Sequence, residues 1–282
     1  MTDRGDRAGP LPEPTTPDGR EGLEQLLRSP ESALLAFDFD GTLAPIVDDP
    51  EQAYAHPDAA AALALVAPSV GQLAIVTGRP ARVAVRLGGF GDVAGLENLI
   101  VLGQYGLERW DAASGRFWSA DQPEGLAVVK SRLPAVLEVL ELEDAVIEDK
   151  GLAVAVHVRR VADPDKAYRW LQPALQALAV QNGLVMEHGR MVLELRPPGM
   201  DKGGALAGLA QEVDARTVMF VGDDLGDLAA FDAVEEFRAE GGFGLLVCSG
   251  STEQTALVER SDVVVDGPSG VVDLLGALAA AL

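Results

Sequence analysis

The sequence predicts an α/β fold in which a doubly wound, Rossmann-like parallel sheet is interrupted by an inserted α+β domain. Three observations predict it. Short apolar strands alternate with helical segments in the first part of the chain, the alternation stops after about Trp110, and it resumes near Asp201. Alternating strands and helices are typical of a parallel sheet that is covered by helices on both faces.

The first part of the core contains three predicted strands and two helices. Apolar runs at 34–37, 73–77 and 98–102 have the composition of buried strands. The alanine-rich segment 57–66 begins with a proline, as helices often do, and 80–87 is a second short helix. This order of strands and helices is the β-α-β pattern of a parallel sheet.

The middle of the chain has a different pattern, in which long helices alternate with hairpins. The expected elements are a helix at 126–140, a hairpin of 145–148 and 152–158, a helix at 164–180 interrupted by Pro173, and a hairpin of 184–187 and 191–195 around the turn 188–190. We therefore expect an α+β cap domain at residues 111–194. Two linkers would connect it to the core, and two linkers can act as a hinge.

The parallel pattern then returns. The expected elements are helices at 201–213, 225–234 and 270–281 and strands at 217–221, 243–248 and 262–265. The core is thus predicted to comprise residues 23–110 and 195–282. Residues 1–22 are rich in Asp, Arg, Gly, Pro and Thr, and this composition predicts a disordered tail.

The charge of the chain restricts its partners. Its 22 basic and 44 acidic residues give a formal net charge of -22, which repels nucleic-acid phosphates. No apolar segment has the length of a signal peptide or a membrane span, so we expect a soluble, cytoplasmic monomer without nucleic-acid or membrane partners. The one cysteine, Cys248, lies in an apolar run and is expected to be buried.

The segment Phe37-Asp38-Phe39-Asp40-Gly41-Thr42 carries the first chemical signal. Asp38 and Asp40 directly follow a predicted buried strand and precede a glycine turn. Open α/β sheets bind their ligands at this end of the strands. Buried carboxylates need a counter-charge, and Mg²⁺ is the expected cation because it takes oxygen ligands from carboxylates and phosphates. A solvated Asp-x-Asp turn is the alternative.

Three further motifs follow in order at predicted strand ends or helix starts. They are Thr77-Gly78-Arg79, Asp201-Lys202-Gly203-Gly204 and Gly222-Asp223-Asp224-Leu225-Gly226-Asp227. Together with the first segment, this set resembles the haloacid-dehalogenase-like (HAD) phosphohydrolases. The resemblance spans nearly the whole core and implies a HAD-like fold.

The resemblance implies roles for the acidic residues. Asp38 is the expected nucleophile, which forms an aspartyl-phosphate, and Asp40 is the expected general acid and then base. Asp223, Asp38 and the backbone carbonyl of Asp40 are expected to hold Mg²⁺. Asp224 is expected to lie next to these ligands, one layer further from the ion. Asp227 is either a further acid of this site or a first-turn acid of the following helix.

The remaining motif residues are expected to bind the phosphate. Thr77 would donate its hydroxyl to a phosphoryl oxygen, and backbone N–H groups near Gly78 and Arg79 would add to this contact. Lys202 would supply a positive charge to the phosphate and to Asp38. A lysine in the first turn of a helix opposes the helix dipole, which favours a functional role over a solvated surface lysine.

Alternation along the hairpins of the inserted domain gathers polar residues on one face. The expected set is Glu148, Lys150, His157, Arg159, Glu194 and Arg196. Mixed carboxylates and cations suit a polyhydroxylated ligand, because sugar hydroxyls both donate and accept hydrogen bonds. The alternative is an ordinary solvated sheet face.

Three segments resemble the trehalose-6-phosphate phosphatase family in particular. They are Asp38 to Val47, Glu148-Asp149-Lys150-Gly151 with Val156-His157-Val158-Arg159, and Glu194-Leu195-Arg196-Pro197. The resemblance implies that Glu148, Lys150 and Glu194 contact the sugar. Two positions depart from the family: Tyr105 stands where it usually has histidine, and Gly226-Asp227-Leu228 where it usually has Thr-Asp-Glu.

The sequence therefore predicts a Mg²⁺-dependent phosphatase that acts on a sugar phosphate, with trehalose 6-phosphate as the expected substrate. Alternatives are another capped HAD phosphatase, acting on sucrose phosphate or mannosylglycerate phosphate, a phosphomutase, or a silent sugar-phosphate sensor. Retention of Asp38, Asp40, Thr77, Lys202 and Asp223 argues against the sensor, because a sensor does not need a nucleophile.

Overall fold

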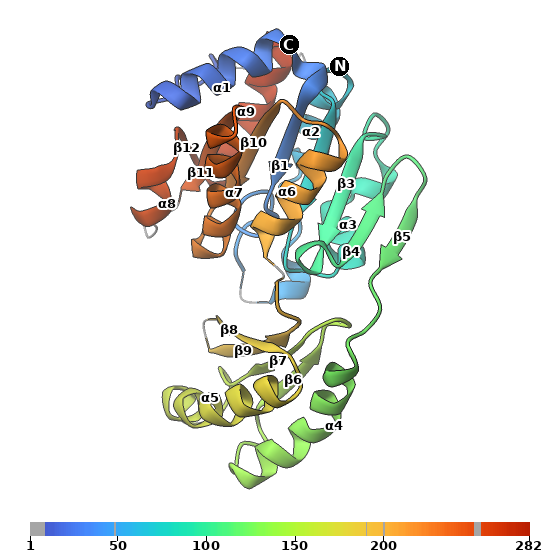
Figure 1. Ribbon diagram of the computed structural model, residues 1–282, viewed down its shortest axis with the longest axis vertical. Coiled ribbons are helices and arrows are strands. Elements are labelled where there is room, and N and C mark those ends of the chain that lie inside the picture. The colour runs from blue at the N-terminus through green and yellow to red at the C-terminus, as the bar shows by residue number, and fades with distance from the viewer. Residues whose placement is uncertain (1–8, 48, 190, 200, 251–254) are drawn as a thin grey trace. The chain divides into compact units, whose positions relative to one another are not determined.

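The computed structural model describes residues 9–47, 49–189, 191–199, 201–250 and 255–282. The chain divides into two compact units (Figure 1). The core unit comprises Met1–Trp118 and Asp201–Leu282, and the inserted unit comprises Ser119–Met200. Each unit has its own sheet and its own apolar core.

The core unit is built on an eight-stranded sheet with the order β12-β11-β10-β1-β2-β3-β4-β5. Neighbouring strands from β12 to β3 are parallel, and β4 pairs with β3 in the antiparallel direction. The strand bounds are β1 Ala33–Phe37, β2 Gln72–Val76, β3 Leu99–Gly103, β4 Glu108–Asp111, β5 Arg116–Ser119, β10 Thr217–Gly222, β11 Phe243–Gly250 and β12 Val263–Asp266.

Helices cover both faces of this sheet, as expected for a doubly wound fold (Figure 1). Side chains of β1 alternate between the two apolar layers: Leu35 and Phe37 pack on one side, Leu34 and Ala36 on the other. The first side is covered by α1 (Pro17–Arg28), α2 (Ala59–Val66), α3 (Ala81–Gly88) and α9 (Gly267–Ala281), and the second by α6 (Lys202–Glu212), α7 (Leu228–Ala239) and α8 (Thr255–Arg260).

The inserted unit has a separate four-stranded antiparallel sheet with the order β6-β7-β9-β8. Its elements are α4 (Glu124–Val139), β6 (Val146–Asp149), β7 (Val154–His157), α5 (Pro164–Gln181), β8 (Val185–Gly189) and β9 (Val192–Arg196). One face packs its apolar residues on both helices. The predicted α/β class with a second α+β sheet is therefore confirmed. The expected interruption at Pro173 was wrong, because α5 continues through it.

The inserted unit begins later than residue 111 and ends later than residue 194. Trp110, which marked the change of pattern in the sequence, belongs to β4 and pairs with Val101 of the core sheet. Its side chain is 4 % exposed and packs in the core. Strand β5 then adds one more strand to the same sheet. The pattern changes at Trp110 because the core sheet becomes antiparallel there. The first segment of the core unit continues for eight more residues, to Trp118.

The expected disordered tail at residues 1–22 was wrong for its described part. Helix α1 begins at Pro17, after Thr16, whose hydroxyl accepts a hydrogen bond from the N–H of Gly19. Asp262 accepts hydrogen bonds from the Thr16 hydroxyl and from Arg238, so this segment is tied to the core. Residues 1–8 lie outside the described residues, as does Arg190 of the predicted turn 188–190. Among the described residues, no helix has the length and apolar composition that crossing a bilayer requires.

Candidate active site

Three neighbouring parallel strands bring the predicted motifs to one edge of the core sheet. Strands β10, β1 and β2 lie side by side, and Asp223, Asp38 and Thr77 each follow the last residue of one of them (Figure 1). The N–H of Asp38 donates to the carbonyl of Val221, so the pairing of β1 with β10 extends to the aspartate. Parallel strands end at the same edge, which is where such sheets bind ligands.

Three buried carboxylates and one lysine form the centre of this edge. Asp38, Asp223 and Asp227 each offer an oxygen within 4.8 Å of the others, and we call these three residues the acid cluster. The Nζ atom of Lys202, the first residue of α6, lies 2.7 Å from Asp38 Oδ1 and 2.7 Å from Asp227 Oδ1. Three buried carboxylates therefore share one buried cation, the ammonium group of Lys202.

A glycine and a serine fix the turn that follows β1. Gly41 has φ of +75°, and a Cβ atom at this position would lie 1.9 Å from Asp223 Oδ2. Only glycine fits both conditions. The Ser249 hydroxyl, at the end of β11, donates to the carbonyl of Gly41 at 2.8 Å. Sequence reasoning missed Ser249, because the motif it supports lies 208 residues away.

The crowding of charge shifts the ionisation of these groups. Burial raises the pKa of Asp38 well above its ordinary value, and Asp227 and Asp223 raise it further, against the opposing effect of Lys202. Burial, then Asp224 and Asp227, raise the pKa of Asp223 to about 8. Burial alone would lower the pKa of Lys202, but Asp38 and Asp227 raise it, so the lysine stays protonated.

Without a divalent cation, we expect the free energy of unfolding to fall as the pH rises from about 4 to about 8. A carboxylate whose pKa is raised by folding binds more protons in the folded state over that interval, so stability is lost as the pH rises through it. For Asp223 the interval runs from 3.8 to about 8. Thermal unfolding in EDTA across this range measures the effect.

The matched control for this prediction is Asp223→Asn, because all other carboxylates still titrate in that variant. Asparagine cannot ionise, so the variant should gain no advantage over the parent at the acid end and a growing advantage towards pH 8. A difference between the two proteins that stays constant with pH would contradict the expectation.

Asp40 and Arg79 form a two-bond ion pair at the rim of the cluster. Arg79 Nε lies 2.6 Å from Asp40 Oδ2, and Arg79 Nη2 lies 2.7 Å from Asp40 Oδ1. Arg79 also donates to the carbonyl of Pro50 at 2.9 Å. Both oxygens of the expected general acid are thus occupied by the residue that the sequence placed in the substrate-binding set.

Thr77 is buried at the end of β2, beside Gly78. Its hydroxyl oxygen accepts a hydrogen bond from the N–H of Arg79 at 3.1 Å. The hydroxyl proton can therefore point elsewhere, which is what donation to a phosphoryl oxygen requires. A second buried threonine, Thr42 of the first motif (residues 37–42), has no hydrogen-bond partner for its Oγ1 atom among the described residues.

The structure places Asp227 and Asp224 differently from each other. Asp227 is fully buried and accepts hydrogen bonds from Lys202 and from the N–H groups of Asp223 and Asp224, at 2.7, 2.9 and 3.2 Å. Asp224 is exposed, and its carboxylate accepts from the N–H of Gly226, so it caps the short 3₁₀ turn Leu225–Asp227. Of the two, Asp227 has its carboxylate in the acid cluster.

The inserted unit brings its predicted polar residues together in pairs. Lys150 Nζ lies 2.6 Å from Glu194 Oε2, and His157 Nε2 lies 2.7 Å from Glu148 Oε2. Glu194 is 9 % exposed, and its other oxygen, Oε1, has no hydrogen-bond partner among the described residues. Arg159 follows β7 in an exposed turn and joins neither pair.

The sheet register arranges these carboxylates in one row. Glu148, Ala155, Glu194 and Glu187 stand opposite one another across β6, β7, β9 and β8. Like charges directly opposite each other on neighbouring strands are destabilising. Here Arg196 pairs with Glu187 at 2.7 Å, and Lys150 pairs with Glu194. Glu187 was missed by the sequence analysis, although its neighbour Met186 is apolar and packs on the helix side of the sheet, so alternation places Glu187 on the polar face.

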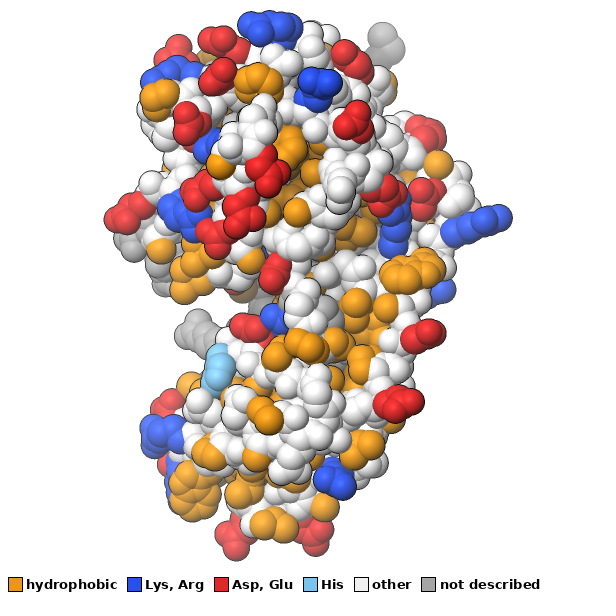
Figure 2. All heavy atoms as spheres, viewed as in Figure 1, with side chains coloured by type: hydrophobic (Ala, Val, Ile, Leu, Met, Phe, Trp, Pro, Cys, Tyr) orange, Lys and Arg blue, Asp and Glu red, His pale blue; other side chains and the backbone are white. Residues whose placement is uncertain are grey.

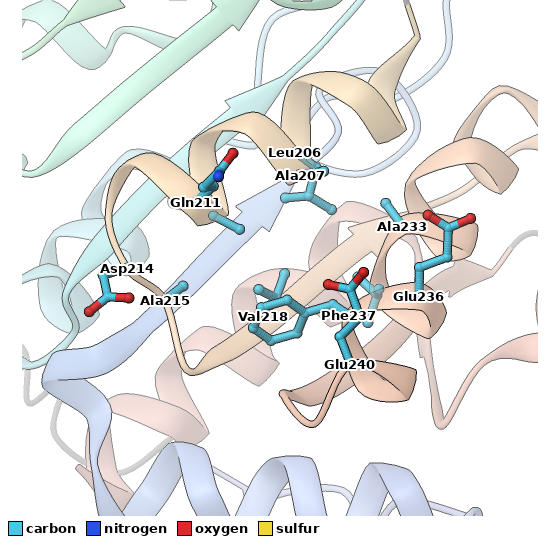
Figure 3. A pocket seen from close by; sticks show the side chains of 12 residues that line it. Leu206, Ala207, Gln211, Asp214, Ala215, Val218, Ala233, Glu236, Phe237 and Glu240 are labelled. Atoms are coloured by element: carbon cyan, nitrogen blue, oxygen red, sulfur yellow. The ribbon is translucent and has the colours of Figure 1, made fainter.

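A hollow elsewhere in the core unit does not contain the candidate site. It measures about 440 Å³ and lies between α6, α7 and the start of β10 (Figure 3). Apolar side chains line it together with the acidic Asp214, Glu236 and Glu240. Acidic side chains also gather on this side of the core unit (Figure 2). Such a lining repels a phosphate, and none of the predicted site residues belongs to it.

The chain is similar to proteins of known family. The family model described as trehalose-phosphatase matches residues 36–263. An uncharacterized glycosyl hydrolase of Mycobacterium tuberculosis is 35% identical over 78% of this chain, which spans only 17% of that protein. The trehalose-6-phosphate phosphatase of Escherichia coli is 32% identical over 82% of this chain and 84% of its own length.

Solved structures share the fold. The C-terminal domain of the C. albicans trehalose-6-phosphate phosphatase is similar with a TM-score of 0.72 and 21% identity, over 96% of this chain and 99% of that one. A haloacid dehalogenase-like hydrolase from Bacteroides thetaiotaomicron is also among the similar structures, with a TM-score of 0.58, so the predicted HAD-like fold is confirmed. We call Glu148, Lys150, His157 and Glu194 of the inserted unit the polar row. The acid cluster, the Thr77–Gly78 turn and the polar row therefore stand in a fold shared with known phosphatases.

Proposed function

Because the chain belongs to the trehalose-phosphatase family, we propose that it hydrolyses trehalose 6-phosphate to trehalose and phosphate. The observation that carries the proposal is the position of Asp38 in the acid cluster, 2.7 Å from Lys202. A carboxylate held beside a lysine can approach a phosphate dianion, because the lysine offsets the repulsion between them.

Asp38 is the proposed nucleophile. Its oxygen forms a bond to phosphorus while the bond from phosphorus to the sugar oxygen breaks, which leaves an aspartyl-phosphate. Asp40 gives a proton to the departing sugar oxygen and then takes one from the water that releases phosphate. Both oxygens of Asp40 are bonded to Arg79 in the structure, so this role requires release of at least one of those bonds. Arg79 is then available to the phosphate.

The acid cluster fits a divalent cation. Three carboxylates with oxygens within 4.8 Å of one another face one lysine, which leaves a buried excess of negative charge. We propose that Asp38, Asp223 and the backbone carbonyl of Asp40 hold Mg²⁺. Asp227 would position Lys202 and the N–H of Asp223. Asp224 would lie next to these ligands without binding the ion directly. When bound, the cation neutralises this charge and that of the phosphate.

The polar row of the inserted unit is the proposed sugar-binding surface. Glu148, Lys150, His157 and Glu194 offer both donors and acceptors, which sugar hydroxyls require. Glu194 Oε1 supports this role, because a buried carboxylate oxygen without a partner is stabilised by a hydroxyl donor. The chemistry would thus belong to the core unit and the choice of sugar to the inserted unit.

Phosphate release from a panel of substrates in Mg²⁺ tests the proposal. The panel contains trehalose 6-phosphate, sucrose 6-phosphate, mannosylglycerate phosphate, glucose 6-phosphate and p-nitrophenyl phosphate. We expect the highest kcat/KM for trehalose 6-phosphate. A clear preference for another sugar phosphate would overturn the substrate, and release from none of them would overturn the enzyme.

Removal of divalent cations with EDTA should abolish turnover of every substrate, and added Mg²⁺ should restore it. Without the cation, the phosphate would meet the uncompensated carboxylates of Asp38 and Asp223. Activity that persists after exhaustive dialysis against EDTA would remove the metal from the proposal and leave the substrate in place.

Variants of the polar row should separate sugar binding from chemistry. Glu148→Ala, Lys150→Ala and Glu194→Ala should each lose about 2–4 kcal/mol in kcat/KM for trehalose 6-phosphate, because each change removes a charged group proposed to hydrogen-bond the sugar hydroxyls. p-Nitrophenyl phosphate has no sugar to bind, so its hydrolysis should change little. Steady-state kinetics on both substrates provide the comparison.

Glu138→Ala is the control for this series, because Glu138 is an exposed acid on α4, away from the row. It should behave as the parent on both substrates. Equal losses on both substrates in the row variants would mean that these residues support folding or chemistry. No loss on either would identify the row as an ordinary solvated face.

A further inference from the structure

The loop after β3 has an unusual backbone. Gln104, Tyr105 and Gly106 have successive φ values of +49°, +56° and +92°. Residues other than glycine rarely adopt this region, and two of these three are not glycine. Such strain persists only where the surroundings impose it, and it concentrates at functional sites. We call residues 104–106 the Tyr105 loop.

The Tyr105 loop is held by the Thr77–Gly78 turn of the candidate site. The N–H of Tyr105 donates to the carbonyl of Thr77 at 3.0 Å, and the N–H of Gln104 donates to the carbonyl of Arg79 at 2.9 Å. The two acceptors, Thr77 and Arg79, are the residues immediately before and after Gly78. The left-handed backbone of residues 104 and 105 is thus used to turn two successive N–H groups towards the turn that follows β2.

The ring of Tyr105 lies against Gly78 itself. A Cβ atom at Gly78 would lie 2.7 Å from the phenol oxygen and 2.8 Å from Cζ of Tyr105, which is closer than any real contact of this kind. A side chain at residue 78 would therefore require the ring of Tyr105 to move from its present place. The half-buried ring therefore forms one wall of the turn.

The loop bears a second cost besides its backbone. Gln104 is 1 % exposed, and its amide nitrogen Nε2 has no hydrogen-bond partner among the described residues. A buried donor without a partner destabilises a fold. The three residues that hold the candidate phosphate-binding turn therefore combine a strained backbone with an unpaired buried donor. One of them, Tyr105, stands where the family usually has histidine.

We propose that Tyr105 is a positioning residue for phosphoryl transfer, which holds the Thr77–Gly78 turn in the shape that receives a phosphoryl group. The inference rests on the proposed phosphatase chemistry of Asp38, but not on the identity of the sugar. Since every substrate presents the same phosphoryl group, changes at Tyr105 should affect all substrates equally. In this respect Tyr105 differs from the polar row.

A double-mutant cycle on p-nitrophenyl phosphate hydrolysis tests the proposal. The proteins are the parent, Gly78→Ala, Tyr105→Ala and the double variant. Gly78→Ala should lower kcat roughly 10- to 100-fold, since a misplacement near 1 Å has effects of this size. In the Tyr105→Ala background the same change should have much less effect, because the ring that it strikes is gone. Additive losses would overturn the proposal.

Three further measurements distinguish positioning from general stability. Tyr105→Phe keeps the ring and should retain most of the activity, whereas Tyr105→Ala should lose about tenfold or more at an unchanged melting temperature. The inhibition constant of inorganic phosphate should rise in Tyr105→Ala. Trehalose 6-phosphate and p-nitrophenyl phosphate should lose activity by the same factor. Full activity of Tyr105→Ala, or a loss for one substrate alone, would overturn the proposal.

Tyr168→Ala serves as the control in the p-nitrophenyl phosphate assay, because Tyr168 belongs to α5 of the inserted unit, whereas the turn belongs to the core unit. If Tyr105→Ala does not fold, Tyr105→Leu replaces it in the cycle, and coupling with Gly78→Ala remains the criterion. Failure of the parent on trehalose 6-phosphate would overturn the substrate proposed above. The cycle on p-nitrophenyl phosphate would still decide the role of Tyr105.

Discussion

Asp38→Asn should lower kcat by at least ~10³-fold while the protein stays folded. The amide cannot attack phosphorus. Of the other two carboxylates of the acid cluster, Asp227 is bonded to Lys202 and to two backbone N–H groups, and Asp223 is a proposed ligand of Mg²⁺. The fold should tolerate the change, because burial raises the pKa of Asp38 and its charge is a burden to the folded state. Single-turnover kinetics and circular dichroism measure the two effects.

The control for this prediction is Asp58→Asn. Asp58 is exposed ahead of α2, and its side chain makes no capping hydrogen bond there. It should keep parental kinetics. Turnover of Asp38→Asn within tenfold of the parent would remove Asp38 as the nucleophile, and with it the aspartyl-phosphate mechanism.

Lys202→Met should have the second largest effect, on both stability and turnover. The change leaves Asp38 and Asp227 buried without the cation that lies 2.7 Å from each. Breaking a buried ion pair by removing one partner has a typical effect of about 3–5 kcal/mol on the free energy of unfolding. We also expect kcat to fall by roughly 10²-fold or more, because Asp38, the proposed nucleophile, and the phosphate then repel each other without compensation. Urea unfolding and steady-state kinetics give the two values.

Lys130→Met is the matched control, since Lys130 also pairs with an aspartate, at 2.5 Å, but Asp149 is 63% exposed. A surface pair of this kind contributes ~1 kcal/mol or less. If both lysine variants lose the same free energy of unfolding, the buried ion pairs of Lys202 stabilise the fold no more than a surface pair does. A Lys202→Met protein that is destabilised but fully active would separate the lysine from the chemistry.

The arrangement of the core motifs could be predicted because strand pattern and motif position agree. Asp38, Thr77 and Asp223 each follow an apolar run, and three parallel strands place their ends together whatever the intervening chain does. Geometry within the cluster is different. Whether Asp227 or Asp224 turns inward depends on the 3₁₀ turn between them, and nothing in the pattern of residues distinguishes two aspartates three residues apart.

Helix α1 shows the limit of composition as a guide. Its buried face consists of Gly19, Gly22 and Leu26, so most of it does not count as apolar. Glycine is needed because a Cβ atom at Gly22 would lie 1.9 Å from the carbonyl oxygen of Gly244. A readable signal was present, since threonine followed by proline is a typical helix start. The conformation of Tyr105 had no such signal, because it is imposed by Thr77 and Arg79.

The central place of β1 in the sheet has a consequence for synthesis of the protein on the ribosome. One edge of β1 pairs with β2, but the other pairs with β10, which begins only at Thr217. All five residues of β1 are buried in the finished sheet. At roughly 5–20 residues per second, this apolar edge stays open for some 10 s or more while the inserted unit is synthesised. A chain that stops before β10 therefore leaves one edge of β1 without a partner strand, and we expect prematurely ended chains to aggregate or to be captured by chaperones.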